Sequence, residues 1–270
     1  MSSIWGIAEA EAIAKQIWEA LLKNASIFPL PKNVHLSDEN IDFLESVLVR
    51  LEQKEPLQYI LERAYFVDFE LFVNSSVLIP RPETEELVLW ILEAQNQEEK
   101  TVLDICTGSG CIALGLAKKG KFRKILGLDI SEAALKVAQK NGIALDLPVD
   151  WLASDILNSG SEIQGDCDIW VSNPPYVLHS EAVEMHESVL LYEPEIALFV
   201  PDANPLLFYK SIAELASQKL KPGGALYFEI NPLFAQETKL LMQNIGFEHV
   251  ELKKDMFGKL RMLRGFLPNA

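Results

Sequence analysis

The chain has 270 residues, 49% of them hydrophobic, and 24 Lys and Arg stand against 39 Asp and Glu, which gives a formal net charge of −15 at pH 7. This length predicts one main domain with a small additional unit. No uncharged apolar run reaches the roughly 18 residues of a membrane-spanning helix, and Glu9 disfavours a signal peptide, so we expect a cytoplasmic protein. The acidic balance disfavours nucleic acid as a partner, because Lys and Arg supply most of the affinity for phosphates.

The first part of the chain is predicted to form a small helical unit. Apolar residues recur at helical spacing from Ile4 to about Leu22 and again from Asn40 to about Leu51. Ser37 precedes the second stretch and is a suitable cap. The alternating, aromatic-rich segment from Tyr65 to Val73 predicts a β-hairpin. We therefore place a domain boundary after residue 74, with domains at 1–74 and 75–270.

Beyond this boundary, strand patterns alternate with helix patterns. The expected strands are 102–105, 124–129, 169–172 and 225–230, and the expected helices are 111–118, 132–141, 205–219 and 235–245. Connections of this length join parallel strands, because a tight turn can join only antiparallel neighbours. Pro222-Gly223-Gly224 is expected to form a turn before the late, hairpin-forming strands. The predicted fold class is α/β with a doubly wound, Rossmann-like sheet.

A glycine-containing loop connects the first of these strands to its helix. Gly108 and Gly110 lack a Cβ, so the backbone can approach a ligand closely, and the helix that follows offers unpaired N–H groups. A purely structural turn remains the alternative, since such turns are common in α/β folds. The residues expected to contact a cofactor in this loop are Cys106, Thr107, Gly108, Ser109 and Gly110.

Two carboxylates strengthen the cofactor interpretation. Asp129 ends the next strand, where a carboxylate can accept hydrogen bonds from both ribose hydroxyls. The loop favours S-adenosylmethionine over a dinucleotide, because Ala113 stands where the dinucleotide fingerprint has its third glycine. Asp155 is expected to accept from an adenine amino group while Ile156 packs on the ring; the alternative role for Asp155 is a helix cap.

The tetrapeptide Asn173-Pro174-Pro175-Tyr176 follows another predicted strand directly. A planar amide nitrogen is a poor nucleophile because its lone pair is delocalised into the carbonyl. The Asn173 side-chain oxygen and the Pro174 carbonyl, held rigid by the prolines, can each accept one N–H of a substrate NH2 and direct its lone pair at a methyl donor. Tyr176 would offer an aromatic face. We expect Asn173, Pro174 and Tyr176 to be catalytic, Pro175 to contact substrate, and no metal to take part.

The tetrapeptide alone leaves other readings open. It permits methylation of adenine in DNA or RNA, whose exocyclic NH2 is also conjugated, although such an enzyme needs a basic groove that the acidic composition does not suggest. A non-catalytic adaptor that binds a cofactor is a second alternative, and the presence of Asn173 argues against it. A structural, proline-rich loop is a third.

Taken together, these segments resemble the release factor glutamine methyltransferases, the PrmC or HemK family. The resemblance rests on five segments that match in chain order: 56–60 (PLQYI), 77–85 (VLIPRPETE), 104–110 (DICTGSG), 172–176 (SNPPY) and 192–198 (YEPEIAL). The segment around Arg81 discriminates best, since the tetrapeptide is shared with other amino methyltransferases. Cys106 is a departure, because the family usually has glycine there.

This resemblance implies a seven-stranded methyltransferase domain and an N-terminal helical domain that helps to hold the partner. It implies transfer of a methyl group from S-adenosylmethionine to the glutamine of the Gly-Gly-Gln motif in bacterial class 1 release factors. The cofactor would contact the loop 106–110, Asp129, the Asp155-Ile156 region and Asn173. The target glutamine would lie on residues 173–176, and Arg81 would contribute to substrate binding unless it only caps the helix that follows.

Overall fold

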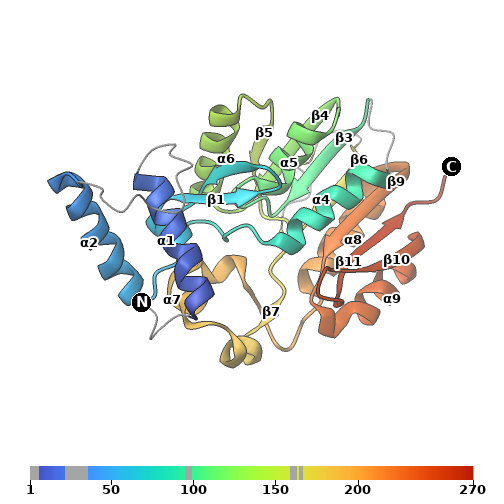
Figure 1. Ribbon diagram of the computed structural model, residues 1–270. Coiled ribbons are helices and arrows are strands. Elements are labelled where there is room, and N and C mark those ends of the chain that lie inside the picture. The colour runs from blue at the N-terminus through green and yellow to red at the C-terminus, as the bar shows by residue number, and fades with distance from the viewer. Residues whose placement is uncertain (1–5, 22–35, 95–98, 159–162, 164–166, 270) are drawn as a thin grey trace.

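The computed structural model describes residues 6–21, 36–94, 99–158, 163 and 167–269. Its centre is a seven-stranded sheet with the strand order β10-β11-β9-β6-β3-β4-β5 (Figure 1). Its strands are β3 (Thr101–Ile105), β4 (Lys124–Asp129), β5 (Asp150–Ala153), β6 (Cys167–Ser172), β9 (Leu220–Glu229), β10 (Glu248–Lys254) and β11 (Leu260–Phe266). Neighbours from β5 to β9 are parallel, whereas β11 is antiparallel to both β9 and β10. The predicted Rossmann-like, seven-stranded α/β fold is confirmed.

The register of the parallel strands brings three functional segments to one edge of the sheet. Ile105, the last residue of β3, pairs with Leu128 of β4 and with Ser172 of β6. The loop after β3, Asp129 at the end of β4 and Asn173 directly after β6 therefore lie at the same edge. Open α/β sheets bind their ligands at this edge.

Helices cover both faces of this sheet (Figure 1). One face carries α4 (Pro82–Ala94), α5 (Cys111–Lys119) and α6 (Glu132–Leu145), and the other carries α8 (Leu207–Lys219) and α9 (Ala235–Ile245). Successive side chains of a strand point to opposite faces. Accordingly, Val102 packs with residues of α4 and α5, while Leu103 packs with residues of α8 and α9. The four helices predicted in this part of the chain are confirmed with small shifts at their ends.

The N-terminal helices form a core of their own. They are α1 (Ile7–Leu21), α2 (Asp38–Glu52) and the short α3 (Leu57–Ile60). The apolar residues that they bury together are Ile13, Ile17, Val47, Leu51, Leu57 and Ile60. The predicted cap is present, since Ser37 accepts a hydrogen bond from the backbone N–H of Asn40. Ile4 and Leu22, the predicted ends of the first helix, lie outside the described residues.

The predicted hairpin is also present, as β1 (Arg63–Phe66) paired antiparallel with β2 (Phe69–Phe72). Phe66 and Leu71 pack in the same core as α4 and α5. Asn141 of α6 ties its side-chain amide to both backbone groups of Phe72, with distances of 2.7 and 3.0 Å. The hairpin thus contacts the sheet domain closely, and the boundary after residue 74 stays a prediction.

A long segment between β6 and α8 forms a wall beside the strand ends. It contains β7 (Val177–Leu178), the 3-10 helix η2 (His179–Glu184), α7 (Glu187–Tyr192), the 3-10 helix η3 (Glu195–Ala197) and β8 (Phe199–Val200). β7 and β8 pair in parallel. A further 3-10 helix, η4 (Pro232–Phe234), follows β9. None of the helices described here combines the length and apolar composition that crossing a membrane requires.

One local expectation needs correction, and one short helix was not expected. Pro222-Gly223-Gly224 does not form a turn ahead of the strand, because β9 begins at Leu220 and contains all three residues. The register with β6 shifts between Cys167 and Ile169, and Gly223 takes a φ of 72°, so an irregular strand accommodates the glycines. The helix α3 was not predicted, because its single turn is too short to show a helical period.

Candidate functional site

Two adjoining pockets lie at the carboxyl edge of the parallel strands. The first, here called the strand-end pocket, is lined by most of the predicted cofactor residues: Cys106, Thr107, Gly108, Ser109, Asp129, Asp155, Ile156 and Asn173. The second, here called the neighbouring pocket, is lined by Arg81, Asn173, Pro174 and Tyr176 together with residues of α7 and η3. Leu78, Arg81, Asn173 and Ala197 line both pockets. These four residues therefore form the boundary across which groups in the two pockets would meet.

Two predicted residues have positions that their assignments did not anticipate. Gly110 is not part of the strand-end lining, and it instead precedes α5 as its N-cap in the left-handed conformation. A Cβ there would lie 2.8 Å from the indole of Trp151, so packing as well as conformation favours glycine. Pro175 lines the strand-end pocket, whereas Pro174 and Tyr176 line the neighbouring one.

The loop after β3 has a left-handed backbone at three positions. The φ angles are 59° at Cys106, 55° at Gly108 and 81° at Gly110. Glycine adopts this region without strain, whereas a side chain makes it unfavourable. A Cβ at Gly108 would meet no atom within 4 Å, so the backbone there faces open space. At Gly108 the loop therefore presents backbone without a side chain to the strand-end pocket.

Asp129 uses both carboxylate oxygens to hold the backbone around it. One oxygen accepts the N–H of Gly108 at 2.8 Å, and the other accepts the N–H of Ser131 at 2.9 Å. Burial raises the pKa of Asp129, and these hydrogen bonds oppose the rise. Each carboxylate oxygen has a second lone pair, so Asp129 can hold the loop in place and still accept two hydroxyl groups.

Two buried residues that the sequence did not identify hold the same loop from behind. Asp104 is fully buried and accepts hydrogen bonds from the Thr107 hydroxyl at 2.5 Å and from the N–H of Ala113 at 3.1 Å. Burial raises the pKa of Asp104 to about 7. Asn141 donates to the carbonyl of Ser109 at 3.0 Å. The loop is thus fixed to both β3 and α6.

Asp155 caps a turn and also lines the strand-end pocket, and its contact with adenine stays a prediction. Its carboxylate accepts from the N–H of Leu157 at 2.9 Å and from the Asn158 side chain at 2.6 Å, which makes it the cap of a turn. Asp155 and Ile156 also line the strand-end pocket. Capping and contact with a ligand are therefore compatible at this position.

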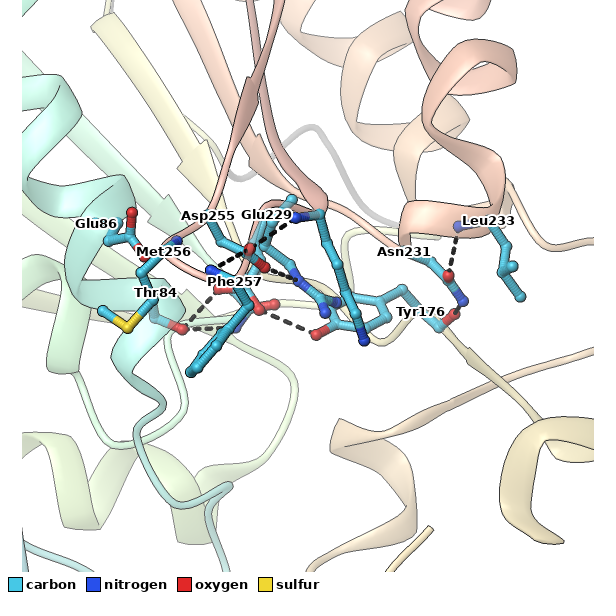
Figure 2. Close-up of polar contacts among 12 residues, drawn as sticks. Thr84, Glu86, Tyr176, Glu229, Asn231, Leu233, Asp255, Met256 and Phe257 are labelled. Carbon is cyan, nitrogen blue, oxygen red and sulfur yellow. Dashed lines mark hydrogen bonds and ion pairs between the residues drawn. The ribbon is translucent and has the colours of Figure 1, made fainter. Parts of the chain in front are cut away.

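The side chain of Asn173 is held by its nitrogen. Nδ2 lies 3.2 Å from the hydroxyl oxygen of Thr84 on α4, and that hydroxyl donates to the carboxylate of Glu229 at 2.6 Å. The hydroxyl of Tyr176 donates to the other oxygen of Glu229 at 3.0 Å (Figure 2). The amide nitrogen is used inside the protein, so the side-chain oxygen of Asn173 is the atom left for a ligand.

Arg81 is oriented by a segment more than a hundred positions away. Its guanidinium lies 2.6 Å from the carboxylate of Glu193, whose side chain is 1% exposed. The second carboxylate oxygen accepts the N–H of Ile79 at 3.1 Å. The hydroxyl of Tyr59 donates to the carbonyl of Val77 at 2.6 Å, so the segment that leads to Arg81 is held at two points, Val77 and Ile79.

The chemistry available here is binding and orientation of polar groups. The strand-end pocket offers carboxylates, bare backbone and an apolar side chain, which suits an adenosine with a flexible polar tail. The boundary offers a neutral amide oxygen at Asn173, and the neighbouring pocket offers a backbone carbonyl at Pro174. Within the described residues, no group of three or more His, Cys, Asp or Glu side chains could hold a metal ion.

Comparison with known proteins relates this arrangement to named enzymes. The family model of the methyltransferase small domain matches residues 84–193. The chain is 41% identical to a release factor glutamine methyltransferase of Flavobacterium psychrophilum, with 98% of this chain and 94% of that protein covered. It is 48% identical to one of Bacteroides thetaiotaomicron, with 82% and 79% covered. A methyltransferase structure from Pyrococcus furiosus is 20% identical, covers 73% of this chain and 88% of its own, and has a TM-score of 0.55, which shows the shared fold.

Proposed function

Because the chain belongs to the family of release factor glutamine methyltransferases, we propose that it methylates the side-chain amide nitrogen of the glutamine in the Gly-Gly-Gln motif of bacterial class 1 release factors. The chain is a methyltransferase, and S-adenosylmethionine is its methyl donor. The observation that carries the proposal is the position of Asn173, which lines both pockets and keeps its side-chain oxygen available.

The strand-end pocket is assigned to the cofactor. Asp129 would accept the ribose hydroxyls with its remaining lone pairs, and the backbone at Gly108 would lie against the methionine part. Asp155 and Ile156 would contact the adenine. When bound, the cofactor supplies an electrophilic methyl group on a sulfonium. These residues do no more than bind and orient it.

The neighbouring pocket is assigned to the target glutamine. A glutamine NH2 carries two N–H donors, and the side-chain oxygen of Asn173 and the carbonyl of Pro174 would accept one each. This arrangement would turn the nitrogen lone pair toward the strand-end pocket and stabilise the positive charge that develops on the nitrogen. The methylated nitrogen would then lose one of its two N–H protons to water, which gives the neutral N-methyl amide. Tyr176 would cover the amide with its ring, and Pro175 would close the wall on the cofactor side. Arg81, held by Glu193, would contact substrate at the boundary.

Contacts of the helical unit support its role in holding the partner. The hydroxyl of Tyr192 donates to the carbonyl of Gln53 at 2.8 Å, and Lys54 pairs with Glu187. Both contacts join the end of α2 to α7, which forms part of the neighbouring pocket. A protein that inserts a loop into this pocket would therefore lie close to the helical unit. The net charge of −15 favours a protein partner over nucleic acid.

One assay tests the proposed substrate. The protein is incubated with methyl-labelled S-adenosylmethionine and, in separate reactions, a class 1 release factor, the same factor with its Gly-Gly-Gln glutamine changed to alanine, and DNA or RNA. We expect label on the unchanged release factor alone. Label on nucleic acid, or equal label on both release factors, would contradict the proposal.

A further inference from the structure

The carboxylate of Glu229 lies behind the catalytic tetrapeptide and is almost fully buried. Glu229 ends β9, next to β6, and is 1% exposed. Its two oxygens each accept a hydroxyl: Thr84 donates to one at 2.6 Å, and Tyr176 donates to the other at 3.0 Å (Figure 2). One buried acid thus binds a residue of α4 and a residue of the tetrapeptide at the same time.

These hydrogen bonds have a direction that reaches Asn173. An ionised carboxylate has no proton and can only accept, so the single proton of the Thr84 hydroxyl must point at Glu229. The oxygen of Thr84 is then an acceptor, and it accepts from Nδ2 of Asn173 at 3.2 Å. A flipped Asn173 amide would bring two acceptors together with no proton between them. The chain of bonds therefore selects one orientation of this amide.

The partners of Glu229 only partly offset the effect of its burial, so its pKa is raised. Burial raises its pKa, whereas the hydrogen bonds from Thr84 and Tyr176 and the charge of Arg261 lower it. Arg261 is in turn held by Asp255, whose carboxylate lies 3.4 Å from its Nε. The hydrogen-bond direction described above belongs to the ionised form of Glu229, which Arg261 and the two hydroxyl donors favour.

We propose that Glu229 is a positioning residue that acts through Thr84 on the amide of Asn173 and directly on the hydroxyl of Tyr176. Its carboxylate ensures that the oxygen of Asn173 faces the substrate amide and that the ring of Tyr176 keeps its angle. This inference rests on the proposed function for its effect on turnover. The hydrogen-bond direction itself is independent of which substrate the protein uses.

Thr84 offers a sharper test than Glu229, because valine has nearly the same shape as threonine and lacks only the hydroxyl. Thr84→Val breaks the link to Asn173, Thr84→Ser restores it, and Glu229→Gln replaces an acceptor oxygen by a donor. Thr238→Val is a matched control, since Thr238 is equally buried and its hydroxyl bonds only the helix carbonyl of Phe234. Turnover of a release factor, affinity for S-adenosylmethionine and thermal unfolding are measured for all four variants.

We expect Thr84→Val and Glu229→Gln to lower kcat by about tenfold or more, with affinity for S-adenosylmethionine changed by less than about threefold. Thr84→Ser should keep kcat near that of the wild type, as should Thr238→Val. Wild-type kcat in Thr84→Val, an equal loss in Thr84→Ser, or a parallel loss of cofactor affinity would overturn the inference. If Glu229→Gln does not fold, the comparison of Thr84→Val with Thr84→Ser tests the inference by itself.

A second readout separates this inference from the proposed function. The side-chain NH2 of Asn173 gives its own nitrogen-proton NMR signals, whose exchange with water does not depend on any substrate. We expect slow exchange in the wild type and in Thr84→Ser, and faster exchange in Thr84→Val. Equal exchange in all three proteins would overturn the inference. A wild type with slow exchange that does not methylate the release factor would overturn only the proposed function.

Discussion

The guanidinium of Arg81 and the carboxylate of Glu193 lie 2.6 Å apart at the boundary between the two pockets. The side chain of Glu193 is 1% exposed and that of Arg81 is 33% exposed. Water can therefore solvate the guanidinium in part, whereas the carboxylate relies on the protein to stabilise its charge. The same carboxylate holds the N–H of Ile79. The pair thus joins the segment before α4 to the residue that follows α7. It also fixes a cation at the place where cofactor and substrate would meet.

Removing the cation alone should therefore be worse for stability than removing both charges. Arg81→Ala leaves a buried carboxylate without its partner and should destabilise the fold by about 2 kcal/mol, below the full effect of a fully buried pair. Arg81→Ala with Glu193→Gln should recover part of that stability but not the activity. Urea unfolding and turnover of Arg81→Ala, Glu193→Gln and the double variant measure this. A double variant whose loss equals the sum of the two single losses would mean that the residues act independently.

Asn173→Ala should separate binding from turnover. Because the side-chain oxygen orients the nucleophile, its removal should lower kcat by about a hundredfold, while affinity for S-adenosylmethionine should fall by less than about threefold. Calorimetric titration and steady-state kinetics measure the two quantities, and Asn244→Ala on the exposed side of α9 is the control. Equal loss of both quantities would assign Asn173 to the cofactor instead.

The backbone at Cys106 makes a prediction about residue size. At a φ of 59° a β-branched side chain is strained, so Cys106→Val should lower the free energy of unfolding by about 1–2 kcal/mol and weaken cofactor binding. Cys106→Gly should bind S-adenosylmethionine at least as well as the wild type, because glycine adopts this conformation freely. Thermal unfolding and titration with S-adenosylmethionine should rank the stability and the cofactor affinity from highest to lowest as glycine, cysteine and valine at position 106. A valine variant that matches the glycine variant in both would exclude strain at this position.

The pKa of Asp104 predicts how stability depends on pH. Burial raises it to about 7 in the folded chain, well above the value near 4 of an exposed aspartate. Between these two values the folded chain binds more protons than the unfolded chain, so the contribution of Asp104 to stability falls as pH rises. Relative to the wild type, Asp104→Asn should therefore become more stable from pH 5 to pH 8. Urea unfolding at several pH values gives this difference, and a difference that is constant or moves the other way would refute the assignment.

Polar residues that come directly after an apolar run could be predicted from the sequence as site residues, whereas polar residues within a predicted strand or helix could not. Asp129 and Asn173 each come directly after a buried apolar run, so their place at the sheet edge follows from α/β construction. Glu229 lies within a strand pattern, and its importance depends on β9 lying beside β6 and on Thr84, which is 145 positions away in the chain. Asn141 similarly gives no signal beyond that of a polar helix residue, and only the structure shows that it contacts the loop after β3.

The central claim is that the methyl group is transferred to the side-chain nitrogen of one glutamine. The most direct measurement is tandem mass spectrometry of a class 1 release factor after incubation with the enzyme and S-adenosylmethionine. We predict that the mass of one methylene is added to a single peptide and that fragmentation places it on the side chain of the Gly-Gly-Gln glutamine. A methyl group on any other residue, or none on a release factor incubated with folded, cofactor-binding enzyme, would contradict the claim.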